Sequence, residues 1–178
     1  LTRRELLDLS LVSSDNLAAM TLAENYPGGT SSFVIKMNEY AKELGLDKSN
    51  FVEPTGLNAQ NYSTMQDIIK LTKIVSEFDI VKNAAQLTNV SFIPDVVEKK
   101  SKKNNKKKRK VHNNPTSQYF GKEGIITIKT GFTRAAGFCI TMLVKANNQL
   151  YNVVVLGAKT KQERQKLVDK MLKTIYNA

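Results

Sequence analysis

Residues that support disulfide, redox and histidine chemistry are nearly absent from this sequence. Its 178 residues include one cysteine, Cys139, and one histidine, His112. A single cysteine excludes an intrachain disulfide, and a single histidine argues against a histidine-based metal site or a Ser-His-Asp triad. Any hydrolytic chemistry must therefore use another base. We expect Cys139 to be a small buried side chain on a strand and His112 to have a structural or incidental role.

Long hydrophobic runs are also missing. No apolar run approaches the roughly 20 residues that would span a bilayer, and no charged segment leads into an apolar one as in a signal peptide. The first residues, Leu1-Thr2-Arg3-Arg4, favour a mature product or a fragment whose targeting signal lies outside this sequence. The hydrophobic fraction of 41% is ordinary for a globular protein, so residues 1–178 are expected to form a single domain with a packed core.

Acidic residues are absent from one strongly basic, low-complexity segment. Residues 99–110 have the sequence KKSKKNNKKKRK, and without these nine positive charges the net charge falls from +11 to +2. The simplest interpretation of Lys99–Lys110 is a solvated insert between strands. Two alternatives are a contact with an anionic polymer, such as phospholipid head groups or cell-wall polyanions, and nucleic-acid binding. The segment has no aromatic residue to stack on bases, so no specific nucleic acid is expected as a partner.

Hydrophobic periodicity and capping residues predict helices in the first half of the chain and strands in the second. Capping-box spacing begins helices at Thr2, Ser63 and Thr160. We expect helices over residues 3–11, 16–25, 30–44, 63–78 and 80–85, and a last helix after residue 160. Strands are expected over residues 87–93, 125–130, 138–146 and 150–156, with a hairpin turn at residues 147–149. This order indicates an α+β fold in which helices pack against an antiparallel sheet.

Two short motifs contain residue types that can carry chemistry: Ser14-Asp15-Asn16 and Lys129-Thr130-Gly131. The first lies between two predicted helices, and the second ends a predicted strand. Each has a purely structural alternative. The first motif could be a plain helix cap, and the second a strand end with a turn glycine. Together they match two of the three motifs that serine-reactive penicillin-binding enzymes use.

Four segments, in this order, resemble the low-molecular-mass penicillin-binding proteins, which are D-alanyl-D-alanine carboxypeptidases and endopeptidases. The segments are Ser13–Ala19, Tyr26–Thr30, Phe51–Leu57 with Ser63-Thr64, and Lys129–Thr133 with Ala135–Cys139. The resemblance is strongest to the D-alanyl-D-alanine endopeptidase branch, often called penicillin-binding protein 7. It covers residues 1–157 apart from the basic segment. It implies a β-lactamase/transpeptidase-like fold, an antiparallel sheet packed by helices, whose N-terminal part is missing here.

The resemblance also implies a reaction. It is a serine-type D-Ala-D-Ala carboxypeptidase or endopeptidase reaction on peptidoglycan stem peptides, through an acyl-enzyme. Ser14 would pass protons toward the leaving amine. Asn16 would hydrogen-bond the substrate amide and hold the lysine that activates the nucleophile. Lys129 would add positive charge beside Ser14, which favours an anionic substrate.

Three further residues would bind the substrate, which would lie beside the strand of residues 125–130 as an added strand. The Thr130 hydroxyl would bind the terminal carboxylate, and Gly131 would let the peptide backbone approach where a Cβ would clash. The N–H of Phe132 would be an oxyanion donor. No metal or organic cofactor is implied. β-Lactams would act as inhibitors once a nucleophile is present, and the location would be periplasmic or otherwise extracytoplasmic.

The nucleophile itself is the missing element. In the family an S-x-x-K serine precedes the first motif by several tens of residues, whereas 13 residues precede Ser14, and no serine here has lysine three residues later. We therefore predict that this chain alone does not hydrolyse peptide bonds. A class A β-lactamase is a near alternative, but the glutamate of its E-x-x-L-N pattern is absent. The competing class is a non-catalytic relative or a polyanion-binding module that uses Lys99–Lys110.

Overall fold

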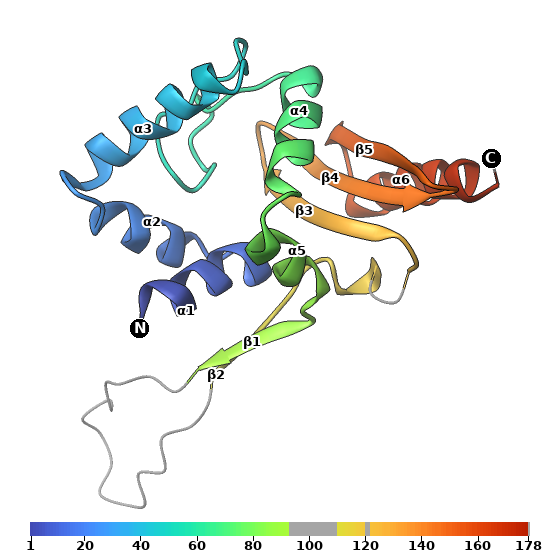
Figure 1. The fold of residues 1–178 in the computed structure, drawn as a ribbon, viewed down its shortest axis with the longest axis horizontal. Coiled ribbons are helices and arrows are strands. Elements are labelled where there is room, and N and C mark those ends of the chain that lie inside the picture. Colours follow the sequence, from blue (N-terminus) through green and yellow to red (C-terminus); the bar gives the residue numbers. More distant parts are fainter. Residues whose placement is uncertain (93–109, 120–121, 178) are drawn as a thin grey trace, which may run out of the picture.

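The computed structural model describes residues 1–92, 110–119 and 122–177. The chain begins with helices, as expected, and the antiparallel sheet follows (Figure 1). The helical part consists of α1 (Arg3–Asp8), a π-helical turn η1 (Leu9–Ser13), α2 (Asn16–Glu24), α3 (Gly29–Glu43), α4 (Met65–Val75) and α5 (Asp79–Gln86).

Three long strands form the central sheet. They are β3 (Ile125–Thr133), β4 (Gly137–Ala146) and β5 (Gln149–Ala158), all antiparallel and in the order β3-β4-β5. Asn147 and Asn148 join β4 to β5 with φ values of 50° and 59°, which are typical of the two-residue turns that close hairpins. The predicted hairpin and α+β class are therefore confirmed. Because β3 pairs only with β4 in the described part of the chain, its other edge is unpaired.

Helices cover both faces of the sheet. Successive side chains of a strand point to opposite faces. Ile140 and Met142 of β4 pack with Val168 of α6 (Lys161–Tyr176). Thr141, which lies between them in the sequence, hydrogen-bonds Thr72 of α4 at 2.6 Å. Thus α6 covers one face and α4 the other, as Figure 1 also shows.

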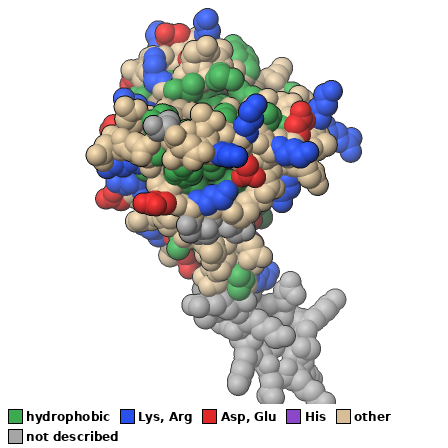
Figure 2. All heavy atoms as spheres, turned by 90° about the vertical axis from the view of Figure 1, so that its right-hand side faces the viewer, with side chains coloured by type: hydrophobic (Ala, Val, Ile, Leu, Met, Phe, Trp, Pro, Cys, Tyr) green, Lys and Arg blue, Asp and Glu red, His purple; other side chains and the backbone are tan. Residues whose placement is uncertain are grey.

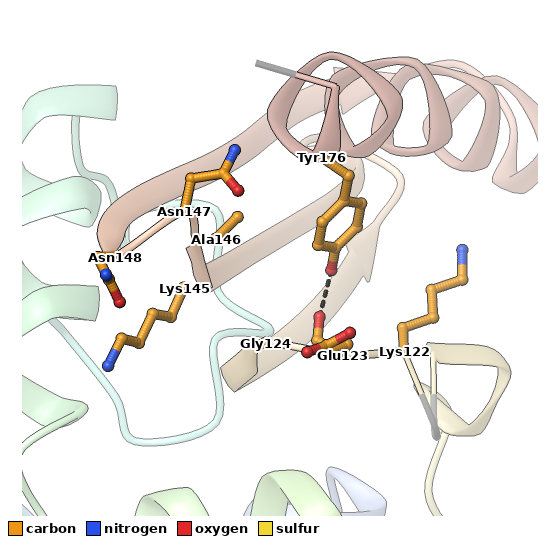
Figure 3. Close-up of a pocket in the computed structure, with 8 residues that line it drawn as sticks. All are labelled: Lys122, Glu123, Gly124, Lys145, Ala146, Asn147, Asn148 and Tyr176. Atoms are coloured by element: carbon orange, nitrogen blue, oxygen red, sulfur yellow. Dashed lines mark hydrogen bonds between the residues drawn. The ribbon is translucent and has the colours of Figure 1, made fainter.

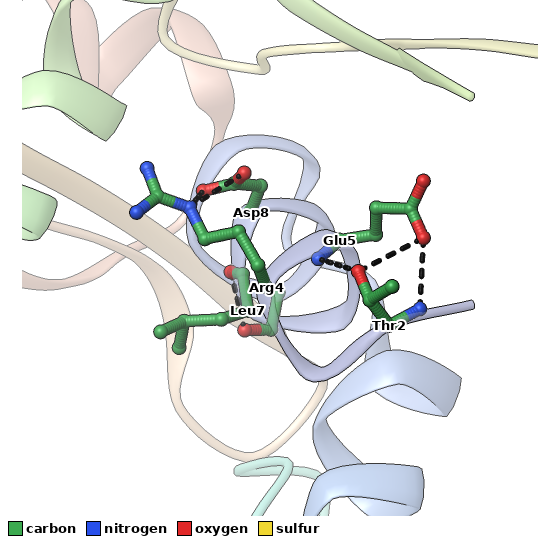
Figure 4. A network of polar contacts seen from close by, with 6 residues as sticks. Thr2, Arg4, Glu5, Leu7 and Asp8 are labelled. Carbon is green, nitrogen blue, oxygen red and sulfur yellow. Dashed lines mark hydrogen bonds and ion pairs between the residues drawn. The ribbon is translucent and has the colours of Figure 1, made fainter.

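Side-chain caps explain where several helices begin. Thr2 and Glu5 make both bonds of the predicted capping box (Figure 4), and Thr160 accepts from the N–H of Glu163 at 3.0 Å. The prediction of Ser63 as the cap of α4 is wrong. Thr64 caps that helix, because the Ser63 hydroxyl instead lies 2.8 Å from the Ser49 hydroxyl.

A two-stranded ribbon precedes the sheet. It pairs β1 (Asn89–Phe92) with β2 (Lys110–Asn113), and β2 was not predicted. The ring of His112 stacks on that of Phe92 with centroids 5.4 Å apart, and its Nδ1 lies 3.9 Å from the Asp15 carboxylate. His112 therefore has packing partners from distant parts of the sequence. Apart from Lys110, the basic segment lies outside the described residues.

A recess at the end of the sheet farthest from the motifs is lined by the residues around the start of β3 and by Tyr176 (Figure 3). The Tyr176 hydroxyl donates to the carbonyl of Glu123, and the N–H of Lys145 donates to the carbonyl of Gly124 at 2.7 Å. A Cβ on Gly124 would lie 2.0 Å from the Lys145 carbonyl oxygen, and the φ of Gly124 is +80°. Both facts require glycine here. These contacts fix the point where β3 begins and therefore help to place its other end, which carries the second motif.

Two observations concern the surface and the helices of the described residues. Within the described residues, no helix has the length and apolar character needed to cross a membrane. On the side of the molecule in Figure 2, Lys and Arg side chains lie among Asp, Glu and uncharged ones. This mixture agrees with the small net charge that remains when the basic segment is left out.

Candidate active site

The two motifs meet at one cleft. Its volume is about 540 Å³, and three segments far apart in the sequence enclose it. They are the region from η1 to the start of α2, the loop Pro54–Leu57, and Lys129–Thr133 of β3. All six residues predicted to form the site line this cleft: Ser14, Asn16, Lys129, Thr130, Gly131 and Phe132.

Ser14 lies at a sharp change of backbone direction. Its φ of 59° and ψ of 39° are left-handed, a conformation that few residues other than glycine adopt. The π-helical turn ends there, and the next residue, Asp15, caps α2 by accepting from the N–H of Ala18 at 2.8 Å. The first motif is therefore a helix cap as well as part of the cleft, because Asp15 caps α2 and all three residues of the motif line the cleft.

Ser14 and Lys129 are bonded directly. The Lys129 ammonium donates to the Ser14 hydroxyl at 2.5 Å and to the Thr130 carbonyl at 3.1 Å. Desolvation by burial lowers the pKa of Lys129 from 10.5 to about 8. Near neutral pH, a lysine with this pKa is mostly protonated yet can give up its proton readily. The pair can therefore transfer a proton through the Ser14 hydroxyl to a group bound in the cleft.

The second motif lies within a strand and not at its end. β3 continues through Gly131 to Thr133, and Gly131 pairs with Cys139 of β4, so the alternative of a turn glycine is wrong. A Cβ on Gly131 would have no protein atom within 4 Å, which means that the space belongs to the cleft. Cys139, expected to be buried, is only partly buried.

Two features of the site were not predicted. The loop Pro54–Leu57 belongs to a segment that resembles the family, but no role in the site was predicted for it, and it forms a wall of the cleft. A second, mostly apolar cavity of about 360 Å³ lies between the sheet, α4 and α5. Both cavities are lined by Leu11 and Lys129. Lys129 therefore faces a polar cleft and an apolar cavity together, and the periodicity of the helices gave no indication of this cavity.

Helices cover both faces of the antiparallel sheet, the Ser14–Lys129 pair lies beside β3, and comparison with solved structures shows that this is the fold of the penicillin-binding proteins. The ampicillin-bound penicillin-binding protein D2 of Listeria monocytogenes has a TM-score of 0.77 and 28% identity, covering 98% of this chain and 68% of that one. The D-alanyl-D-alanine carboxypeptidase DacD of Francisella tularensis has a TM-score of 0.81 at 23% identity, covering 96% and 51%. The second likeness concerns the fold alone.

The sequence comparisons show the family. The D-alanyl-D-alanine carboxypeptidase family of peptidases matches residues 1–160, and the chain belongs to this family. The D-alanyl-D-alanine endopeptidase of Escherichia coli is 35% identical over 158 residues, which are 89% of this chain and 48% of that protein. The carboxypeptidase DacF of Bacillus subtilis is 32% identical over 173 residues, 97% and 42% respectively. The chain thus spans about half the length of the curated relatives it matches, and the predicted resemblance is confirmed.

Proposed function

We propose that this chain carries the proton-transfer and substrate-binding part of a serine-type D-Ala-D-Ala carboxypeptidase/endopeptidase. The observation that carries the proposal is the 2.5 Å bond between Lys129 and Ser14 beside the unpaired edge of β3. An edge strand can bind an extended peptide through its backbone, and the Ser–Lys pair then lies beside the bond to be cleaved. The reaction would be acyl transfer to a serine outside these 178 residues, followed by hydrolysis.

Each site residue has a role that its position supports. Ser14 would relay a proton from Lys129 to the leaving amine, and Asn16, which is exposed in the cleft, would hydrogen-bond the substrate amide. The Thr130 hydroxyl would bind the terminal carboxylate beside the positive charge of Lys129. Gly131 leaves room for the peptide, and the N–H of Phe132 would stabilise the oxyanion.

The substrate class comes from the family, whose matched relatives are D-alanyl-D-alanine carboxypeptidases and endopeptidases. The substrate would be a peptidoglycan stem peptide that ends in D-Ala-D-Ala or carries a D-Ala cross-link, and the unpaired edge of β3 supports a peptide that binds in an extended conformation. A β-lactam would occupy the same cleft, as the ampicillin-bound form of the Listeria protein suggests. Because peptidoglycan lies outside the cytoplasmic membrane, we place the activity in the periplasm or its extracytoplasmic equivalent.

Release of D-alanine from a defined stem pentapeptide tests this proposal. The assay would use a joined polypeptide, in which this chain is fused to the part of the Escherichia coli endopeptidase that it does not match. We expect D-alanine release by the joined polypeptide and none by this chain alone. A joined polypeptide with native-like circular dichroism but no release would contradict the function. Release by this chain alone would contradict the need for an outside nucleophile.

A second candidate function is the binding of an anionic polymer through Lys99–Lys110. Its support is the concentration of nine positive charges in residues 99–110, together with the β1–β2 ribbon, in which Phe92 and Lys110 pair at one end. We expect binding to phosphatidylglycerol vesicles at low salt that weakens as salt rises. Deletion of residues 99–110 should abolish it. Equal binding by the deletion variant, or none by the parent chain, would rule this function out.

A further inference from the structure

The loop of residues 51–62 is organised around one carboxylate. Glu53 accepts hydrogen bonds from the Thr55 N–H at 2.6 Å, from the Thr55 hydroxyl, from the Asn58 N–H at 3.2 Å and from the Asn61 amide at 2.6 Å. All four donors are uncharged and belong to the same loop. Hydrogen bonds to an ionised acceptor are about twice as strong as bonds between neutral groups, so Glu53 fixes the loop internally.

Two asparagines hold this loop, one from within it and one from α3. The Asn61 side-chain oxygen accepts from the N–H of Val52 at 2.6 Å. Asn38 of α3 both accepts from the N–H of Phe51 at 2.9 Å and donates to its carbonyl at 2.7 Å. The loop is thereby anchored to α3 at its start and to itself at its end. A loop with so many side-chain to backbone bonds keeps one conformation without regular secondary structure.

The part of the loop that Glu53 holds is a wall of the candidate active site. Pro54, Thr55, Gly56 and Leu57 line the cleft together with Lys129–Thr133 of β3. Leu57 is 59% exposed and so presents an apolar surface at the polar site. The Thr55 hydroxyl and N–H are both directed to Glu53, so this wall offers the cleft mainly apolar side chains.

We propose that Glu53 is a positioning residue that fixes Pro54–Leu57 as a preformed wall of the cleft. This inference rests on the proposed function. The wall and the edge of β3 together would hold an extended peptide, with the peptide backbone on β3 and an aliphatic part of the substrate against Pro54 and Leu57. A wall that is fixed before binding does not have to be ordered at that moment, which lowers the entropic cost of binding.

The ionisation of Glu53 agrees with this role. Burial raises the pKa of Glu53, but the hydrogen bonds from Thr55, Asn58 and Gly56 lower it more, so the pKa lies below the usual 4.5. A carboxyl with a lowered pKa stabilises the folded loop above its ordinary pKa, and this contribution is lost as the pH falls through the lowered value. The wall should therefore be fully formed at neutral pH and should loosen below about pH 4.5.

Amide hydrogen exchange on this chain tests the wall directly, with Glu53→Gln as the variant. We expect the protection of the Thr55 and Asn58 amides at pH 7 to fall by about tenfold, because charge-assisted bonds are lost. In the parent, protection of these amides should fall as the pH drops below 4.5, and the variant should lack this dependence. The matched control is Glu24→Gln on the exposed end of α2, which should behave as the parent. Unchanged protection in Glu53→Gln would overturn the proposal.

Acylation kinetics of the joined polypeptide distinguish a positioning role of Glu53 from a general loss of protein stability. We expect Glu53→Gln to weaken pre-acylation binding of benzylpenicillin by about tenfold, with the acylation rate constant within about twofold of the parent. A variant that is only destabilised would contain less active protein, but its active molecules would bind and react with benzylpenicillin as the parent does. Equal loss in both constants would overturn the positioning role. If the parent joined polypeptide is not acylated at all, the proposed function fails, whereas the exchange result on the wall still stands.

Discussion

Incubated with benzylpenicillin, the 178-residue chain is expected to keep its unmodified mass, whereas the joined polypeptide gains the mass of one penicilloyl group. The cleft of this chain holds Ser14 and Lys129, bonded at 2.5 Å, but no serine of the sequence is followed three residues later by lysine. Acylation needs a nucleophile activated by an adjacent base. Ser14 accepts from the ammonium of Lys129, which holds the proton and does not remove one from Ser14.

Intact-mass spectrometry gives an all-or-none result in this experiment. The control is a joined polypeptide in which the serine of S-x-x-K is changed to alanine, which should remain unmodified. An adduct on this chain alone would mean that Ser14 is itself acylated and that our assignment of it as a proton relay is wrong. Absence of an adduct on a folded joined polypeptide would favour the non-catalytic relative, and the basic segment would then be the part to study.

The apolar cavity beside Lys129 must also be filled in the joined polypeptide. Its lining includes Leu71 and Val75 of α4 and Val81 of α5. Apolar surface that is left open costs stability, at roughly 25 cal/mol per Å². A segment that brings a nucleophile to Lys129 from this side would have to present apolar side chains to the cavity. The same segment would therefore complete both the site and the packing.

Sequence reasoning placed the site better than the details of the fold around it. Each motif is a short run of residue types that can carry chemistry, so Ser14 and Lys129 could be identified separately. No knowledge was needed that these two residues, 115 positions apart in the sequence, are hydrogen-bonded in the fold. The capping box of α1 and the Thr160 cap of α6 were also readable, because in each case both partners lie within one turn. The cap of α4 was not, since the contact that diverts Ser63 comes from Ser49, which lies 14 residues earlier in the same connection between α3 and α4.

Features that depend on tertiary contacts gave no sequence signal. β2 contains Lys110 and His112, whose polar and charged character argues against a strand. It forms because Phe92 and Asp15 provide partners for the His112 ring. The segment Phe51–Leu57 contributed to the family resemblance, but its place as a wall of the cleft was not predicted, and only the network around Glu53 shows why it is fixed. Such contacts join residues that no local pattern relates.

Replacing Lys129 with methionine is expected to stabilise the chain and at the same time remove its chemistry. Burial lowers the pKa of Lys129 to about 8, so the folded protein binds this proton less tightly than the unfolded chain does. Stability must then rise with pH between about 8 and 10.5, and the cost of burying the charge is fully present below pH 8. One pKa unit corresponds to about 1.4 kcal/mol. Allowing for partial exposure and the lost bond to Ser14, we expect Lys129→Met to gain about 1–3 kcal/mol at pH 7.

Denaturant unfolding at several pH values measures this gain. The difference between Lys129→Met and the parent should be largest below pH 8, should shrink as the pH rises to 10.5, and should disappear above that value, where the parent lysine is neutral in both states. Lys145→Met is the matched control, because Lys145 lies on β4 of the same sheet but is exposed. It should change stability little and show no such pH dependence. A gain that does not vary with pH would mean that burial of the charge is not its cause.

In the joined polypeptide the same substitution should slow acylation by benzylpenicillin by about 10²- to 10³-fold, as expected when one preorganised charge is removed from a site where charge develops. Stopped-flow or quenched intact-mass kinetics would measure the rate. Lys145→Met should leave it unchanged. The two effects of Lys129→Met have one cause: the site holds a cation at a place where the folded protein would be more stable without it. A variant that lost stability and activity together would indicate that Lys129 is a packing residue, and the Ser14–Lys129 relay would be wrong.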